Sequence, residues 1–80
     1  MLMADYIEAA MREARYEVLE DGTWYAEIPE LKGVWSDADT REQSRKELEE
    51  VLEEWIYLRL SRNLPIPPMG GVVIKAPSTA

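Results

Sequence analysis

Apolar residues near the start of the chain recur at intervals of three or four, which is the spacing of one helix face. Charged residues fill most of the positions between them. The pattern predicts an amphipathic first helix over residues 2–14, about three turns long. Its methionines are expected to fill the core, with an adaptable binding groove as the alternative use. The apolar side of this helix would consist of Met3, Tyr6, Ile7, Ala10, Met11 and Ala14.

A hairpin is predicted directly after this helix. Residues 16–20 alternate between apolar and polar types, as a half-buried strand does, and Asp21-Gly22 follows them. This dipeptide favours a two-residue type I′ turn, in which both central residues have positive φ. Such a turn would place Leu19 opposite Trp24 and would thereby fix the register of the two strands.

The predicted register assigns the hairpin side chains to two faces. The face against the long helix would carry Leu19, Trp24, Ala26 and Ile28. The opposite face would carry Tyr16, Val18 and Tyr25 among the polar residues Glu20, Thr23 and Glu27. This second set is apolar enough to need partial cover, either from the first helix or from another chain.

Proline, glycine and threonine mark the next boundaries. Pro29 ends the second strand, because proline has no backbone N–H to donate to a ladder. A turn that contains Gly33 then leads to a short third strand over residues 34–36. Thr40 is followed three positions later by Gln43, which is a capping box at the start of a helix.

The longest apolar pattern predicts a helix over residues 41–62. Its buried stripe would comprise Leu48, Val51, Leu52, Trp55 and Leu58, widened by Ile56 and Leu60. At about 1.5 Å per residue the helix would span roughly 33 Å and overhang a sheet of short strands. The opposite side carries an acidic run, which we term the acidic strip: Glu49, Glu50, Glu53 and Glu54. The strip is either a solvated helix face or a docking site for a basic partner.

The C-terminal part begins with an irregular segment, because residues 63–71 contain three prolines and two glycines. A short fourth strand is predicted over residues 72–75, at a sheet edge or paired with another subunit. Residues 76–80 would form a frayed tail. The chain, 1–80, is thus predicted to be one α+β domain in the order α-β-β-β-α-β, with a small antiparallel sheet packed against one long helix.

Composition narrows the classes of function. The 80 residues include 16 Asp and Glu against 9 Lys and Arg, a formal charge of −7, which repels nucleic acid and favours a basic protein partner. Without cysteine or histidine, the chain cannot use disulfides, thiol nucleophiles, most zinc sites or the commonest general base. A core this small favours self-association. No signal peptide or membrane span is recognisable, so a cytoplasmic protein is expected.

Any enzymatic activity would have to come from carboxylates. The candidates for a metal-dependent nuclease site are Glu17, Glu27, Asp37 and Asp39. The predicted register points the first two to opposite faces, and helix capping explains the last two. We therefore expect no catalytic site, no bound metal and no cofactor. The three tryptophans are expected to be core or interface anchors.

An ordered series of short motifs lies within residues 20–42: EDG, AEIP, L-x-G and DT-x-E, with further matching residues on both sides from about 15 to 67. In this order the motifs resemble the antitoxins of the HicB type and the small stand-alone proteins similar to their N-terminal domain. Two short segments depart from the usual pattern. Residues 36–39 stand in place of a glycine-containing turn, and Gln43-Ser44 stands in place of an acid and an alanine. The motif residues expected to be structural are Asp21, Gly22, Pro29, Gly33 and Thr40.

The resemblance implies a β-β-β-α-β fold like a degraded ribonuclease H that lacks the catalytic acids. It also implies that the chain masks the RNA-facing surface of a small basic toxin, HicA, which cleaves messenger RNA, and that it forms dimers or tetramers. Many relatives carry a DNA-binding segment, and none is expected here. The residues expected to contact a partner or a second copy are Tyr16, Val18, Tyr25, Glu27, Glu49, Glu50, Glu53 and Glu54. The alternatives are an orphan oligomeric structural protein and a vestigial metal-dependent nuclease.

Overall fold

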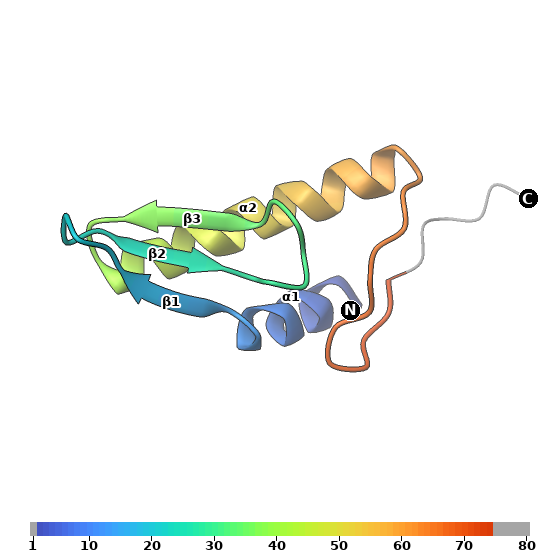
Figure 1. The fold of residues 1–80 in the computed structure, drawn as a ribbon. Coiled ribbons are helices and arrows are strands. Elements are labelled where there is room, and N and C mark those ends of the chain that lie inside the picture. The colour runs from blue at the N-terminus through green and yellow to red at the C-terminus, as the bar shows by residue number, and fades with distance from the viewer. Residues whose placement is uncertain (1, 75–80) are drawn as a thin grey trace, which may run out of the picture.

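Two helices and a three-stranded antiparallel sheet follow one another along the chain (Figure 1). The computed structural model describes residues 2–74. Its elements are α1 (Leu2–Arg12), β1 (Arg15–Val18), β2 (Trp24–Glu27), β3 (Trp35–Ala38) and α2 (Arg41–Ser61). The strands pair in the order β1-β2-β3, and α2 lies behind the sheet in Figure 1. The predicted α+β class and the order of these five elements are confirmed.

Helix α2 begins where the sequence predicts, because Thr40 caps its first turn. The Thr40 hydroxyl oxygen accepts a hydrogen bond of 3.1 Å from the backbone N–H of Gln43, which satisfies one of the free donors at a helix start. The other end closes as a Schellman motif. There Asn63 adopts a left-handed φ of 56°, and the Leu64 N–H donates to the Arg59 carbonyl at 2.8 Å.

The buried side of α2 follows a line of every fourth residue. This line consists of Ser44, Leu48, Leu52 and Ile56. Each step of four residues turns about 40° around the helix, so the buried line drifts only slowly from one side. At the far end it reaches Ile56, and Leu58 lies on another side of the helix. The Leu58 side chain is 49% exposed, and its predicted place in the buried stripe is wrong. Val51 and Trp55 are half-buried beside the line.

The turn between β1 and β2 has three residues rather than the predicted two. The Gly22 N–H donates to the Leu19 carbonyl at 2.9 Å, and the Leu19 N–H donates to the Thr23 carbonyl at 2.7 Å. Gly22 has a φ of 87°, whereas Asp21 is not in the left-handed region. This is the pattern of a type I turn followed by a glycine bulge. The predicted type I′ turn is therefore wrong.

Asp21 stabilises this longer turn with its side chain. Its carboxylate accepts hydrogen bonds from the Thr23 N–H at 3.0 Å and from the Thr23 hydroxyl at 2.6 Å. These two bonds lower the pKa of Asp21, because they favour the ionised form. A β-bulge adds one residue to one strand, so the turn also shifts the register of the hairpin.

The observed register pairs Val18 with Trp24 and Tyr16 with Ala26. Compared with the prediction, β1 is shifted by one residue, and such a shift moves every side chain to the other face. Tyr16 and Val18 therefore share the side of Ala26, which packs on α2, and not the side of Tyr25. Leu19, predicted to lie in the core, is an exposed hydrophobic residue. The predicted positions of Ala26 and Ile28 in the core are confirmed.

Ser36 of β3 and Ser44 of α2 join the sheet to the helix. Both are buried, and the Ser36 hydroxyl donates to the Ser44 carbonyl oxygen at 2.7 Å. The two hydroxyl oxygens lie 3.3 Å apart. Small side chains at both positions let α2 approach β3 closely, and the hydrogen bond satisfies the buried Ser36 hydroxyl.

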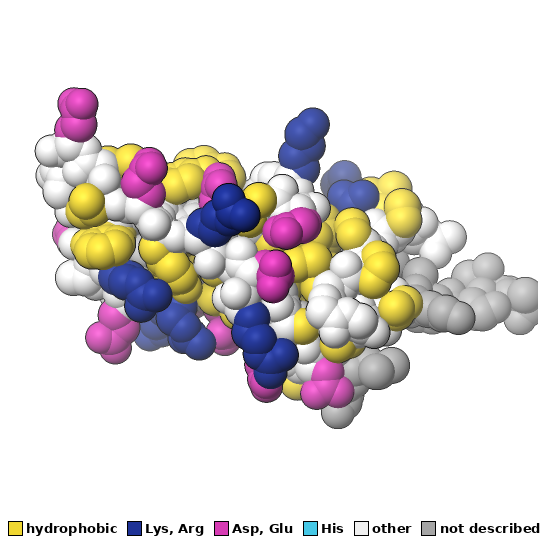
Figure 2. Space-filling model, turned by 60° about the horizontal axis from the view of Figure 1, so that its bottom comes forward, with side chains coloured by type: hydrophobic (Ala, Val, Ile, Leu, Met, Phe, Trp, Pro, Cys, Tyr) yellow, Lys and Arg dark blue, Asp and Glu magenta, His cyan; other side chains and the backbone are white. Residues whose placement is uncertain are grey.

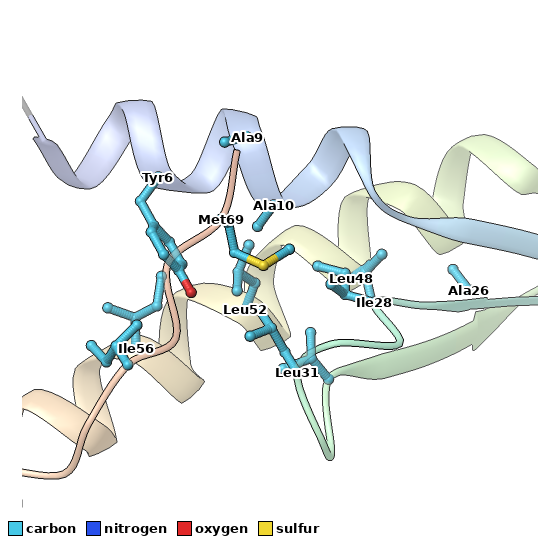
Figure 3. Close-up of a cluster of buried hydrophobic side chains, with 12 residues drawn as sticks. Tyr6, Ala9, Ala10, Ala26, Ile28, Leu31, Leu48, Leu52, Ile56 and Met69 are labelled. Atoms are coloured by element: carbon cyan, nitrogen blue, oxygen red, sulfur yellow. The ribbon is translucent and has the colours of Figure 1, made fainter. Parts of the chain in front are cut away.

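The segment after α2 completes the core and covers α1. Figure 3 shows Tyr6 and Met69 reaching toward Leu52 and Ile56, from α1 and from this segment. The Tyr6 hydroxyl donates to the Pro67 carbonyl at 2.6 Å. All four side chains are buried, so the irregular segment packs as part of the fold.

The predicted fourth strand is not formed in its described part. Val72 makes one isolated bridge with Met69, across a turn in which Gly70 and Gly71 both have positive φ. This tight turn folds the segment back on itself, so it does not extend along a sheet edge. Residue 75 and the predicted tail at 76–80 lie outside the described residues. Within the described part, neither helix has the length and apolar character that crossing a membrane requires.

Tyr6 makes the stability of the fold depend on alkaline pH. Burial raises the pKa of its hydroxyl above the ordinary value of 10.0, because the phenolate is poorly solvated there. The neutral form is favoured by folding, so its contribution is complete below the unfolded pKa and is lost as pH rises through the folded pKa. We expect urea stability to fall above pH ~10.

Tyr6→Phe separates the two roles of this side chain. The variant should lose about 1 kcal/mol at neutral pH through the missing hydrogen bond and should show a smaller alkaline decline than the wild type. Urea midpoints measured from neutral to alkaline pH check both effects. An alkaline decline of the same size in wild type and Tyr6→Phe would assign the effect to another group.

Candidate functional site

The side of the sheet away from α2 is turned toward solvent in the described structure (Figure 1). Alternation along the three strands and the observed pairing assign its side chains. We term this surface the open sheet face, and it consists of Arg15, Glu17, Tyr25, Glu27, Trp35 and Asp37. Each of the three strands supplies two of these residues, so the backbone ladder holds them in fixed relative positions.

Two aromatic rings occupy the middle of the open sheet face. Tyr25 of β2 and Trp35 of β3 stack with their ring centroids 5.9 Å apart and their planes inclined by 25°. The Tyr25 hydroxyl also donates to a Glu27 carboxylate oxygen at 3.0 Å, which further orients the ring. Trp35 nevertheless remains 50% exposed. A stacked aromatic pair with one half-exposed ring is typical of the energetic centre of a protein interface.

Acidic side chains surround the aromatic pair. Glu17, Glu27 and Asp37 give three negative charges against the single positive charge of Arg15, a formal total of −2 for this face. Burial, the hydrogen bond to Glu27 and the nearby carboxylates together raise the pKa of Tyr25. Its hydroxyl therefore stays neutral and keeps its proton for donation at physiological pH. Such a surface favours a cationic partner.

The shared face of Glu17 and Glu27 corrects the argument against a nuclease site. That argument placed the two carboxylates on opposite faces, whereas the observed register puts both on the same face as Asp37. Tyr25 stands directly between Glu17 and Asp37 in the pairing. Among residues 2–74, no group of three potential ligand side chains is placed to hold a metal ion.

The sheet divides the predicted interface residues. Tyr25 and Glu27 lie on the open sheet face, but Tyr16 and Val18 lie on the helix side. There the guanidinium carbon of Arg41 lies 4.3 Å from the centre of the Tyr16 ring, a cation–π contact that covers the ring. Val18 remains 55% exposed near the end of the hairpin.

The acidic strip lies on a different layer of the molecule. Helix α2 packs on the sheet with the line of Leu48 and Leu52, and Glu50, Glu53 and Glu54 are exposed on its other sides. Glu49 is half-buried and lines a groove between α1 and α2. The sheet and the body of α2 therefore separate the strip from the open sheet face.

The motif residues act in turns and caps. Pro29 follows Ile28, whose carbonyl accepts the Leu31 N–H at 2.9 Å and closes a turn around the proline. The next turn is closed by the Val34 N–H and contains Gly33 at a φ of 90°, which glycine adopts without strain. Asp21, Gly22 and Thr40 have the turn and capping roles described above. These residues position the open sheet face but do not form it.

The predicted interface left out four members of the open sheet face: Arg15, Glu17, Trp35 and Asp37. The omission of Glu17 follows from the register, because a two-residue turn puts Glu17 on the other side of β1. A usable signal existed for Trp35, because it directly follows the apolar residue Val34 in a short predicted strand, and the structure buries both Val34 and Ser36. Alternation along a strand therefore sends Trp35 outward. Figure 2 shows hydrophobic side chains interspersed with charges of both signs rather than merged into one apolar patch.

Comparisons with known proteins agree with this fold. The family model described as UPF0150-like matches residues 5–67. The crystal structure of TTHA0281 from Thermus thermophilus is 38% identical in sequence and superimposes with a TM-score of 0.91. That match covers 98% of this chain and 98% of the other. Among curated proteins, none matches the chain.

Proposed function

This chain belongs to the UPF0150-like family, and on that premise we propose that it is an antitoxin-like protein-binding module. The module would neutralise a small basic HicA-type toxin, which cleaves messenger RNA, by covering the toxin's RNA-facing surface. The resemblance of the EDG, AEIP, L-x-G and DT-x-E motifs to HicB-type antitoxins supports this proposal. So does the formal charge of −7, because it favours encounter with a basic protein.

The observation that carries the proposal is the composition of the open sheet face. An RNA-binding surface presents cations and donors spaced to meet phosphates. Glu17, Glu27 and Asp37 offer carboxylates to such cations, and Arg side chains bind carboxylates and phosphates with the same planar fork. The Tyr25–Trp35 pair adds the desolvated apolar centre that a stable complex needs. The open sheet face can therefore compete with RNA for the RNA-binding surface of the toxin.

The acidic strip has a separate role in this proposal. A small partner seated on the open sheet face would not reach Glu50, Glu53 and Glu54, because the sheet and α2 lie between. Their charges would instead raise the rate of encounter through long-range attraction, which salt screens over about 10 Å at 0.1 M. We therefore expect charge reversal in the strip to slow association and leave the dissociation rate nearly unchanged.

An RNA-cleavage assay tests the proposed activity. The probe is a purified small basic HicA-type toxin, incubated with messenger RNA and increasing amounts of the wild-type chain. We expect cleavage to fall to background once the chain equals the toxin in amount. Glu27→Lys should abolish protection, because it places a cation at the centre of the basic contact. Glu54→Lys is the matched control, with the same charge change on α2, and should still protect.

Two outcomes would contradict the proposal. Full cleavage in the presence of excess wild-type chain would remove the antitoxin activity and leave an oligomeric structural protein. Equal protection by wild type and Glu27→Lys would show that the toxin does not contact the open sheet face. Circular dichroism of both variants establishes that they are folded, because the two side chains lie outside the buried core.

A further inference from the structure

The outer edge of β1 carries backbone groups that no strand among residues 2–74 uses. β1 is an edge strand, and the Leu19 N–H donates to the Thr23 carbonyl at 2.7 Å. Bonded and non-bonded pairs alternate along an antiparallel ladder. In the observed register this alternation turns the N–H and C=O groups of Tyr16 and Val18 away from β2. Such an edge is a template for another strand.

We propose that a second copy of this chain pairs with this edge, with the two β1 strands antiparallel and Tyr16 opposite Tyr16 of the second copy. The two-fold axis would pass between these two residues and stand perpendicular to the sheet. Such an axis turns the helix side of both sheets in the same direction. Both α2 helices would therefore cover one side of a continuous six-stranded sheet. A contact of this kind is self-complementary and closes as a dimer.

Charge selects this register over its neighbour. With Tyr16 at the axis, Arg15 lies opposite Glu17 of the second copy, and the pair occurs twice. Both side chains are exposed and lie on the open sheet face, so they are available for cross-strand ion pairs. The next register that the backbone allows is centred on Glu17 and would put two carboxylates directly opposite each other.

The helix side of the same pairing is apolar. In the proposed register Val18 faces Ala14 of the second copy, and the two Tyr16 side chains face each other. Val18 is 55% exposed in the single chain, and this contact would cover it. The Arg41 guanidinium carbon lies 4.3 Å from the centre of the Tyr16 ring and already orients it. Dimer formation therefore costs little side-chain entropy at Tyr16.

The other edge of the sheet does not offer the same match. The Ile28 N–H donates to the Val34 carbonyl at 3.1 Å, and alternation then turns the backbone groups of Trp35 and Asp37 outward on β3. This strand carries an acid and no cation, so two β3 strands would gain no ion pair. The β1 edge is therefore the edge expected to pair with a second copy. This inference does not rest on the proposed function, because it involves no toxin.

Charge-reversal variants of the full chain test the pairing and its register. By sedimentation equilibrium at low ionic strength we expect a dimer for the wild type. Arg15→Glu and Glu17→Arg should each raise the dimer Kd by about ten-fold or more, because each replaces two attractive pairs with two repulsive ones. An equimolar mixture of the two variants should form a dimer as tight as the wild type, since each introduced charge then faces its opposite.

A proline variant gives an independent readout. Val18→Pro removes an outward N–H that only the second copy would use, and Val18→Thr keeps it as the matched control. We expect the first to be monomeric and the second dimeric, with the circular dichroism spectrum of the wild type in both. A monomeric wild type overturns the proposal. So does a dimer that persists unchanged in Val18→Pro and both charge variants, or a mixture of the charge variants that stays monomeric.

Discussion

Replacing Trp35 with alanine is expected to weaken binding of a HicA-type partner by about 2 kcal/mol, roughly thirty-fold in Kd. The ring is 50% exposed, and its stack on Tyr25 holds it in one orientation before any partner arrives. Association therefore gains the apolar contact at little cost in side-chain ordering. Isothermal titration of the wild type and Trp35→Ala with the purified partner measures the difference.

Tyr57→Ala is the matched control for this prediction. Tyr57 is a large aromatic residue with 71% exposure on α2, so its removal deletes a ring without touching the open sheet face. We expect partner affinity to change less than about two-fold in this control, as for surface positions outside a hot spot. A loss of affinity of equal size in both variants would argue for a general effect. An unchanged affinity in Trp35→Ala would remove Trp35 from the interface.

Loss of stability should be small in Trp35→Ala and large in a core variant. The stacked pair contributes about 0.5–1.5 kcal/mol beyond its burial, so the variant should remain folded. Thermal unfolding of Trp35→Ala alone establishes this before any titration. The comparison matters because a domain of this size is expected to have only about 4–12 kcal/mol of stability.

Leu52→Ala is expected to reduce the free energy of unfolding by about 2–5 kcal/mol. Leu52 is fully buried at the middle of the α2 line, and Figure 3 shows it among side chains of both helices, of the turn after β2 and of the segment after α2. Truncation removes apolar contacts and leaves a cavity that the packed elements cannot fill. Urea unfolding followed by circular dichroism gives the difference, and part of the population should be unfolded without denaturant.

Leu58→Ala is the control that tests the orientation of α2. The sequence pattern placed Leu58 in the buried stripe, but its side chain is 49% exposed in the structure. Truncation should therefore cost about 1 kcal/mol or less. A cost as large as that of Leu52→Ala would mean that the helix turns Leu58, and not Ile56, to the core.

The order of elements was predictable because several local signals agree. The Thr40 cap, the proline after β2 and the glycine in the following turn each act over two to four residues. Their effects do not depend on the rest of the fold. The apolar spacing of α2 likewise identified Leu48 and Leu52, which lie in the middle of the helix where the phase is best determined.

The register of the hairpin could not be predicted in the same way. Asp21-Gly22 is compatible with a two-residue turn and with a three-residue turn, and only the second lets Asp21 accept both hydrogen bonds from Thr23. One residue of difference moved Tyr16 and Val18 to the helix side and Glu17 to the open sheet face. The candidate site was therefore only partly predictable, although its residue types and its strands were.

Contacts between distant residues were a second limit. Ser36 and Ser44 each depart from the usual motif pattern, and the sequence gives no reason to consider them together. In the structure one hydrogen bonds to the other across the contact of β3 with α2. The same holds for Tyr6 and Pro67, which are joined across 61 positions of the chain. Packing of the C-terminal segment against α1 also explains why the expected edge strand does not form there.

The most direct test of the partner surface uses the three tryptophans as reporters. Trp24 lies on the helix side of the sheet, Trp35 on the open sheet face, and Trp55 on α2, where Arg59 contacts its ring at 4.8 Å. Each indole N–H gives one signal in a nitrogen-15 correlation spectrum. On titration with the HicA-type partner, we predict that the Trp35 signal shifts or broadens while those of Trp24 and Trp55 stay in place. A shift of Trp55 with Trp35 unchanged would contradict the account.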